Sequence, residues 1–227
     1  ESRAVTTGGG QRVEYDFLFV ATGLMLDYTR IEGMEAGLIG REGIASIYAG
    51  PEAAAASYRA IDGFVDAGGT ALFTRPATEM KCAGAPLKIT FITDDLARRR
   101  GRRGAVELIY NAHNPTVFSV PPVDARVKAM FADRGVAINF DHVMTGIDPG
   151  ARQAHFRTPD GDVVLDYDLI HVVPPMRAPD AVLNSPLPWQ DGALAADGWV
   201  EADKATLRHP RYPEVFAVGD IAGVPRG

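Results

Sequence analysis

The strongest constraint on the fold is a regular alternation of apolar runs and helix-like segments between residues 70 and 140. The runs at 70–74, 105–112 and 136–140 have the composition of buried strands. The segments between them, 86–100 and 121–134, each begin with proline, which is favoured in the first turn of a helix. Strands that alternate with helices usually form a parallel sheet, so the pattern predicts a βαβαβ unit of the doubly wound α/β class.

Other elements are expected on both sides of this unit. Pro51 begins a predicted helix that ends near Asp66. The segment 143–165 alternates short apolar runs with turn residues, which favours two or three antiparallel strands. The remaining expectations are a hairpin at 2–15, fully buried strands at 15–23 and 168–173, a connection at 24–50, a loop at 177–198 and a strand at 215–220.

The composition excludes several classes of protein. The 227 residues are 46% apolar and carry a net charge of −6, which disfavours a nucleic-acid-binding surface. No apolar run reaches the roughly 18–20 residues of a membrane-spanning helix. One cysteine excludes an internal disulfide, and the histidines lack the spacing of metal ligands, so no metal site is expected. Because the chain begins with Glu1 and not with methionine, we expect a segment of a longer protein.

The single cysteine, Cys82, lies in the turn at 79–88, between a predicted strand and a predicted helix. Many parallel α/β proteins bind a phosphate at such a turn, but with a G-x-G-x-x-G pattern that is missing here, so NADH binding is not expected. The helix N-terminus and the cations of Lys81 and Lys88 favour a thiolate, which predicts fast alkylation of Cys82. A buried, inert thiol is the alternative interpretation.

Two short motifs follow predicted strands on either side of the βαβαβ unit. Ala21-Thr22-Gly23 ends one strand, and Gly219-Asp220 ends the other. This order resembles the flavin-linked, disulfide-reductase-like enzymes, in which such strands leave and re-enter the FAD domain. The resemblance implies that Thr22, Gly23, Gly219 and Asp220 bind FAD, with Asp220 bonded to its ribitol chain.

Longer blocks of sequence are similar to the sulfide:quinone oxidoreductases, in particular to the branch that includes the mitochondrial enzyme. The blocks are Lys81-Cys-Ala-Gly-Ala-Pro86 with Lys88; Leu169-Ile-His-Val-Val-Pro-Pro-Met176 with Pro179-Asp180; and Gly198-Trp-Val200 with Asp203-Lys204, Thr206-Leu207 and Arg211-Tyr-Pro213 through Asp220. They span residues 81–220, which is most of the chain.

This resemblance implies a two-dinucleotide-binding-domain flavoprotein that oxidises sulfide to sulfane sulfur through FAD and redox cysteines, and reduces a quinone. Cys82 would be the catalytic residue, with a partner cysteine beyond Gly227. The implied partners are sulfide, quinone and a small-molecule sulfur acceptor. Parts outside this segment would bind the surface of an energy-transducing membrane, bacterial or mitochondrial. The segment itself is expected to be soluble and inactive.

The resemblance also implies a division into three parts. Residues 1–48 would belong to the FAD domain, 49–176 would form a complete NADH-domain-like unit carrying Cys82, and 177–227 would return to the FAD domain. Two positions depart from the family pattern. Leu87 stands where the family commonly has glutamine, and Ile221 where the mitochondrial branch has cysteine. These departures leave the sulfur acceptor open.

Two alternative functions remain. One is the flavoprotein subunit of a flavocytochrome c sulfide dehydrogenase, which would pass electrons to haem. The other is a non-catalytic flavin-fold module that binds a partner or carries persulfide sulfur. Two features have structural interpretations. The arginines between 98 and 103 are expected to form a solvated helix end and not a lipid-binding patch, and His171 is expected to be a hydrogen-bonded core residue.

Overall fold

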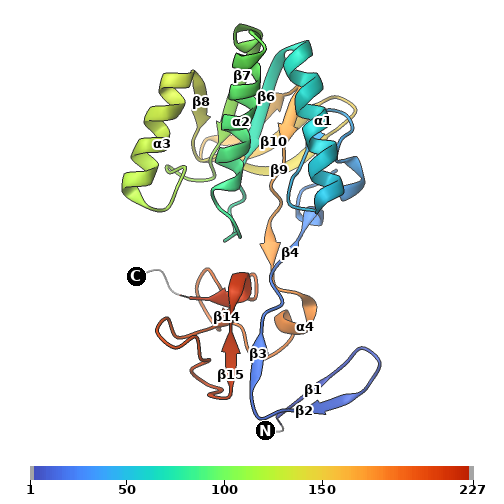
Figure 1. The fold of residues 1–227 in the computed structure, drawn as a ribbon, viewed down its shortest axis with the longest axis vertical. Helices are drawn as coiled ribbons and strands as arrows, with labels where there is room; N and C mark the ends of the chain where they lie inside the picture. The colour runs from blue at the N-terminus through green and yellow to red at the C-terminus, as the bar shows by residue number, and fades with distance from the viewer. Residues whose placement is uncertain (1–2, 225–227) are drawn as a thin grey trace. The chain divides into compact units, whose positions relative to one another are not determined.

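The computed structural model describes residues 3–224, and the chain divides into two compact units (Figure 1). Unit 1 contains the residues up to Met25 and from Met176 onward, whereas unit 2 contains Leu26–Pro175. The second boundary lies one residue from the predicted one. The first differs from the predicted boundary after residue 48, because residues 26–48 are part of unit 2. The assignment of the units to an FAD domain and an NADH-like domain stays a prediction.

Unit 2 is built on a five-stranded parallel sheet with the strand order β5-β12-β6-β7-β8. The strands are β5 (Ile44–Ala45), β6 (Gly69–Thr74), β7 (Val106–Asn111), β8 (Val136–Asn139) and β12 (Leu169–His171). The helices are α1 (Pro51–Ala67), α2 (Ala85–Arg99) and α3 (Pro121–Arg134). The order β6-α2-β7-α3-β8 confirms the predicted βαβαβ unit.

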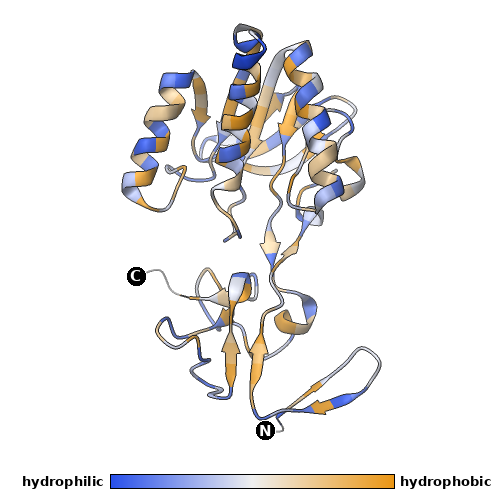
Figure 2. Cartoon of the chain, viewed as in Figure 1, coloured by the Kyte–Doolittle hydropathy of each residue, from blue (hydrophilic) through white to orange (hydrophobic). Residues whose placement is uncertain are grey.

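The two faces of this sheet are covered by different layers. Leu108 and Tyr110 of β7 pack in the core shared with the three helices, whereas Ile109 between them packs on the opposite face. That face is covered by a three-stranded antiparallel sheet, β9 (Val143–Asp148), β10 (Gln153–Thr158) and β11 (Gly161–Asp166). In Figure 2 the strands of unit 2 are coloured mainly as hydrophobic, whereas the helices carry both hydrophobic and hydrophilic residues. Burial on both faces explains why these strands read as continuous apolar runs.

Residues 26–48 belong to unit 2 because their apolar side chains are buried in its second core. Tyr28, Ile31 and Met34 pack there with Phe156 of β10. The edge strand β5 extends the parallel sheet by pairing Ile44 with Ile170 of β12. The sequence showed only an aperiodic connection in this region, because its apolar residues do not follow the period of a regular helix or strand.

The arginine-rich end of α2 forms ion pairs with neighbouring elements. Asp94 of α2 is fully buried and accepts hydrogen bonds from Arg98, Arg103 and Arg134, at 2.8, 2.6 and 2.6 Å. Arg100 pairs with Asp62 and Asp66 of α1. The expectation of a merely solvated helix end was therefore incomplete, since these cations join α2 to both neighbouring helices.

Unit 1 contains short strands around a smaller core. Its elements are β1 (Ala4–Thr6), β2 (Arg12–Glu14), β3 (Leu18–Val20), α4 (Asp180–Leu183), β14 (Val200–Glu201), β15 (Val215–Ala217) and β16 (Ala222–Gly223), with β4 (Met25–Leu26) and β13 (Met176–Arg177) where the chain crosses between units. β1 and β2 form the predicted hairpin, and β3 pairs in parallel with β15. Val20, Val200 and Val215 contribute to the core.

Two predictions for unit 1 were wrong in detail. The strand predicted at 15–23 is shorter, and Phe19 is 63% exposed, so one of its faces is open; its ring stacks on Phe216 at 5.0 Å. The loop predicted at 177–198 contains the one-turn helix α4, which follows Pro179 and has Asp180 in its first turn, where an acid is favoured by the helix dipole. The prolines of this segment disfavour long helices and central strands, but they allow a helix of one turn.

Candidate functional site

Cys82 lies in the loop between β6 and α2, and its side chain is exposed. This position excludes a buried thiol, whereas the reactivity of Cys82 stays a prediction. The backbone of Cys82 adopts a left-handed conformation, with φ = 49°, which is uncommon for residues other than glycine. Such strained positions often occur where a side chain has a chemical role, so the geometry fits a reactive thiol.

Two hydrogen bonds to its carbonyl oxygen hold Cys82 in place. The hydroxyl of Tyr48 donates at 3.1 Å, and the backbone N–H of Ala85 donates at 2.8 Å. Tyr48 lies just before α1 and is distant from the thiol in sequence. Sequence reasoning missed it, because no motif marks the segment around it. The two bonds fix the loop immediately before α2 and leave the sulfur accessible.

Lys88, expected beside the thiol, lies over the start of α2. Its Cε is 3.9 Å from the point where a Cβ on Gly84 would stand. No hydrogen bond or ion pair between its ammonium group and Cys82 is found within residues 3–224. The thiolate stabilisation expected from Lys81 and Lys88 therefore stays a prediction.

Polar side chains are buried near Cys82, at the carboxyl ends of the parallel strands. Burial raises the pKa of Tyr48, and the nearby Cys82 and Tyr110 raise it further, so Tyr48 stays a neutral donor. Tyr110 is fully buried, and burial raises the pKa of its hydroxyl as well. Burial also lowers the pKa of His113 to about 4, with a further contribution from Arg75. Near neutral pH, Tyr48, Tyr110 and His113 are therefore uncharged, and the guanidinium of Arg75 lies near all three.

The four residues expected to bind FAD come together in unit 1. The parallel pairing of β3 and β15 sets Val20 opposite Ala217, so Thr22 and Gly23 leave the same edge as Gly219 and Asp220. Thr22, Gly219 and Asp220 are exposed, and Gly23 is partly so. Asp220 lies in a single 3-10 turn that follows β15.

The geometry of these residues fits a bound ligand such as FAD. Gly23 and Gly219 have φ angles of 65° and 74°, which disfavour other residues. A Cβ at either position would meet no atom within 4 Å, so the backbone borders open space. A ligand could approach both glycines closely, and the carboxylate of Asp220 could accept hydrogen bonds from its hydroxyl groups.

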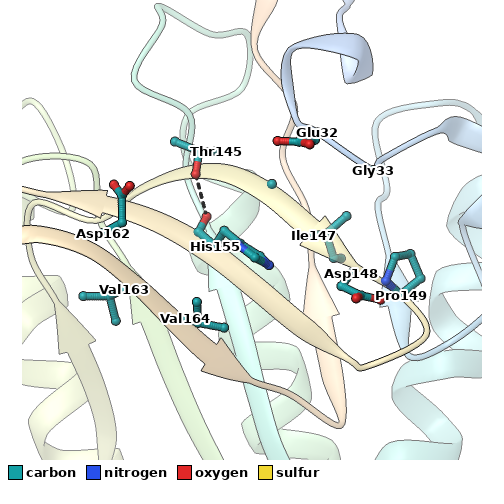
Figure 3. Close-up of a pocket in the computed structure, with 11 residues that line it drawn as sticks. Glu32, Gly33, Thr145, Ile147, Asp148, Pro149, His155, Asp162, Val163 and Val164 are labelled. Carbon is teal, nitrogen blue, oxygen red and sulfur yellow. Dashed lines mark hydrogen bonds between the residues drawn. The ribbon is translucent and has the colours of Figure 1, made fainter.

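A pocket of about 530 Å³ in unit 2 was not indicated by any sequence motif (Figure 3). It lies against the antiparallel sheet, where the hydroxyl of Thr145 donates to the carbonyl of His155 at 3.3 Å. Glu32, Asp148 and Asp162 contribute carboxylates to its lining. None of the residues expected to bind FAD or sulfur lines it, and within residues 3–224 no group of three metal-ligating side chains is arranged to hold a metal.

Comparison with known proteins identifies relatives over the whole chain. It is 37% identical over 225 residues to the mitochondrial sulfide:quinone oxidoreductase of Dictyostelium discoideum, and 35% identical over 228 residues to that of Mus musculus. Each match covers 99% of this chain and 48% of the relative, so the chain spans about half the length of these relatives. A scan against protein-family models found no match.

Solved structures confirm the fold. The sulfide:quinone oxidoreductase of Aquifex aeolicus superposes with a TM-score of 0.77 and 20% identity, over 99% of this chain and 50% of that one. This likeness confirms the predicted α/β fold of the two-dinucleotide-binding-domain flavoproteins.

Proposed function

We propose that the chain belongs to the sulfide:quinone oxidoreductase family, to whose mitochondrial members it is 35–37% identical, and that the protein containing it oxidises sulfide to sulfane sulfur and reduces a quinone. The observation that carries this proposal is the 37% identity over 99% of the chain, which includes the exposed Cys82. Within the whole enzyme, unit 2 would present the sulfur-carrying residue and unit 1 would form part of the FAD site.

Cys82 would carry the sulfur. Hydrosulfide would attack a sulfur bridge between Cys82 and a second cysteine; one S–S bond breaks, a new one forms, and one cysteine leaves as a thiolate. The chain contains a single cysteine, so the second must come from residues outside it. The exposed position of Cys82 allows this attack, and the hydrogen bond from Tyr48 holds the loop during it.

FAD would be held in unit 1 by Thr22, Gly23, Gly219 and Asp220. Bound there, FAD would supply the two-electron redox chemistry that links the sulfur centre to the quinone. Gly23 and Gly219 allow its close approach, and Asp220 would orient it by accepting hydrogen bonds. The residues of this chain would therefore hold FAD in position and orient it.

The partners would be sulfide, a quinone and a small-molecule sulfur acceptor. Two of the named relatives are mitochondrial enzymes, which supports a location at an energy-transducing membrane such as the mitochondrial inner membrane. In the part of the chain that the structure describes, no helix has the length and hydropathy of a membrane span. Attachment would be peripheral, through parts of the protein outside this chain.

The test is sulfide-dependent quinone reduction by the complete protein, with Cys82→Ser and Asp220→Ala variants. Cys82→Ser should abolish turnover and keep the bound flavin, because unit 2 carries the thiol. Asp220→Ala should weaken FAD retention, measured by flavin absorbance after gel filtration. Asp95→Asn, on the exposed side of α2, serves as the control. Unchanged sulfide oxidation by Cys82→Ser would disprove the proposed role and favour a non-catalytic module.

A further inference from the structure

A second, smaller pocket in unit 2 is lined by cationic side chains. It has a volume of about 210 Å³ and lies where β6 and β12 end, beside β9 and β10. Arg30, Arg75 and Arg157 line it, together with the threonines Thr78 and Thr145. The residues that line it include no aspartate or glutamate. Three arginine residues therefore contribute to the lining of a small space to which no aspartate or glutamate contributes.

Arg75 is the most informative of the three arginines because it is buried. Its side chain follows β6 directly, and the residue is only 7% exposed. One terminal nitrogen donates to the carbonyl of Val117 at 3.2 Å, but the buried Nε has no hydrogen-bond partner in the described structure. No ion pair joins Arg75 to a carboxylate among residues 3–224. A buried cation without a counterion is unfavourable, so an anion bound in this pocket would stabilise Arg75.

The other two arginines come from separate elements and are exposed. Arg30 ends the 3-10 turn Tyr28–Arg30, and Arg157 lies in β10. In the strand register Arg157 stands opposite Asp162 of β11, yet no ion pair joins these two side chains within the described residues. Its guanidinium is therefore available to the pocket. Planar guanidinium groups bind tetrahedral oxyanions through paired N–H donors.

We propose that this pocket binds a small, doubly charged oxyanion of the size of sulfate or phosphate. The positive charge of the lining favours an anion over a neutral or cationic ligand. The volume selects a small one, because sites for larger ligands usually have about 300–1,000 Å³. Cys82 and the residues expected to bind FAD do not line the pocket. The proposal therefore does not depend on the proposed function.

The test is calorimetric titration of the full chain with sodium sulfate and sodium phosphate at low ionic strength. We expect saturable 1:1 binding, which chloride at equal ionic strength does not reproduce. Arg75→Met should weaken the affinity by about tenfold or more, since it removes the buried charge. Arg157→Gln should weaken the affinity by about three- to tenfold, because it removes the charge and the paired donors. Arg157→Lys should weaken it by less, because lysine keeps the charge and loses only the paired donors.

Arg99→Gln is the matched control. Arg99 pairs with Asp95 on the exposed side of α2 and does not line the pocket. The affinity of the Arg99→Gln variant for the anion should therefore equal that of the parent chain. If Arg75→Met does not fold, the exposed Arg157→Gln decides alone. Adenosine monophosphate distinguishes a free anion from the phosphate of a nucleotide. Tighter binding of the nucleotide than of phosphate would overturn the assignment to a free anion, as would non-saturable binding or equal affinity in Arg157→Gln.

Discussion

The imidazole of His171 lies fully buried at the end of β12, where Phe73 of β6 is a neighbour. The expected burial in the core is therefore confirmed, but the expected hydrogen bond is missing, because neither ring nitrogen has a partner in the described structure. The sequence could predict that the ring lies in a buried strand. It could not predict the hydrogen-bond partners of the ring, because the neighbouring atoms come from other strands. Burial lowers the pKa of His171 to about 4, with only a partial offset from its own backbone.

This lowered pKa predicts a pH dependence of stability. The folded chain keeps His171 neutral, whereas the unfolded chain takes up a proton below about 6.5, so stability falls as pH decreases from about 6.5 to about 4. Replacing His171→Leu should reduce the loss of unfolding free energy between pH 7 and pH 5 by about 1–2 kcal/mol. Urea unfolding at both pH values measures this loss. The exposed His155→Gln is the control, and an unchanged pH dependence in His171→Leu would contradict the prediction.

At the scale of elements, the buried carboxylate of Asp94 joins α2 to α3. Burial by itself would raise the pKa of Asp94, but hydrogen bonds from Arg98, Arg134 and Arg103 outweigh it and lower that pKa. The carboxylate is therefore charged in the folded chain. Its contribution to stability is present above the unfolded pKa of about 4 and is lost as pH falls through the lower folded value.

Adjacent aspartates of α2 allow a matched comparison. Asp94→Asn should lower the free energy of unfolding by about 3 kcal/mol, because it leaves three arginines around a neutral side chain. Asp95→Asn removes only the exposed pair with Arg99 and should cost less than about 1 kcal/mol. Urea unfolding followed by circular dichroism measures both. Similar losses in the two variants would show that the buried network contributes no more than a surface ion pair.

At the scale of the whole molecule, the two units have separate apolar cores. The core of unit 1 contains Val20, Val200 and Val215, whereas both cores of unit 2 are formed by residues between 26 and 173. Both tryptophans, Trp189 and Trp199, lie in unit 1. The three long helices lie in unit 2. Tryptophan fluorescence therefore reports unit 1, and helical circular dichroism reports unit 2.

These separate signals predict two unfolding transitions. Asp94→Asn should move the circular dichroism midpoint to lower urea and leave the fluorescence midpoint unchanged, because units with separate cores can unfold independently. The wild-type chain and Asp95→Asn provide the reference midpoints. A parallel shift of both signals in Asp94→Asn would show that the two units unfold as one cooperative structure.

Much of unit 2 could be predicted from the sequence, because its strands and helices carry local signals. The helix at 121–134 begins with two prolines and ends before Gly135, which adopts a left-handed conformation with φ = 66°. Strands buried on both faces appear as continuous apolar runs, so their order along the chain was readable. The position of Cys82 before a helix followed from the same patterns, whereas the pairing of the strands before Gly23 and Gly219 was not predicted.

Tertiary structure alone decided which distant residues meet. The bond from Tyr48 to the Cys82 carbonyl, the missing partners of His171 and the arginine-lined pocket at Arg75 all depend on contacts between separate elements. The physical reason is the range of the interactions. Helix starts, turns and apolar periodicity act over a few residues and are written in the sequence, whereas burial and pairing of a polar side chain depend on neighbours contributed by other strands and helices.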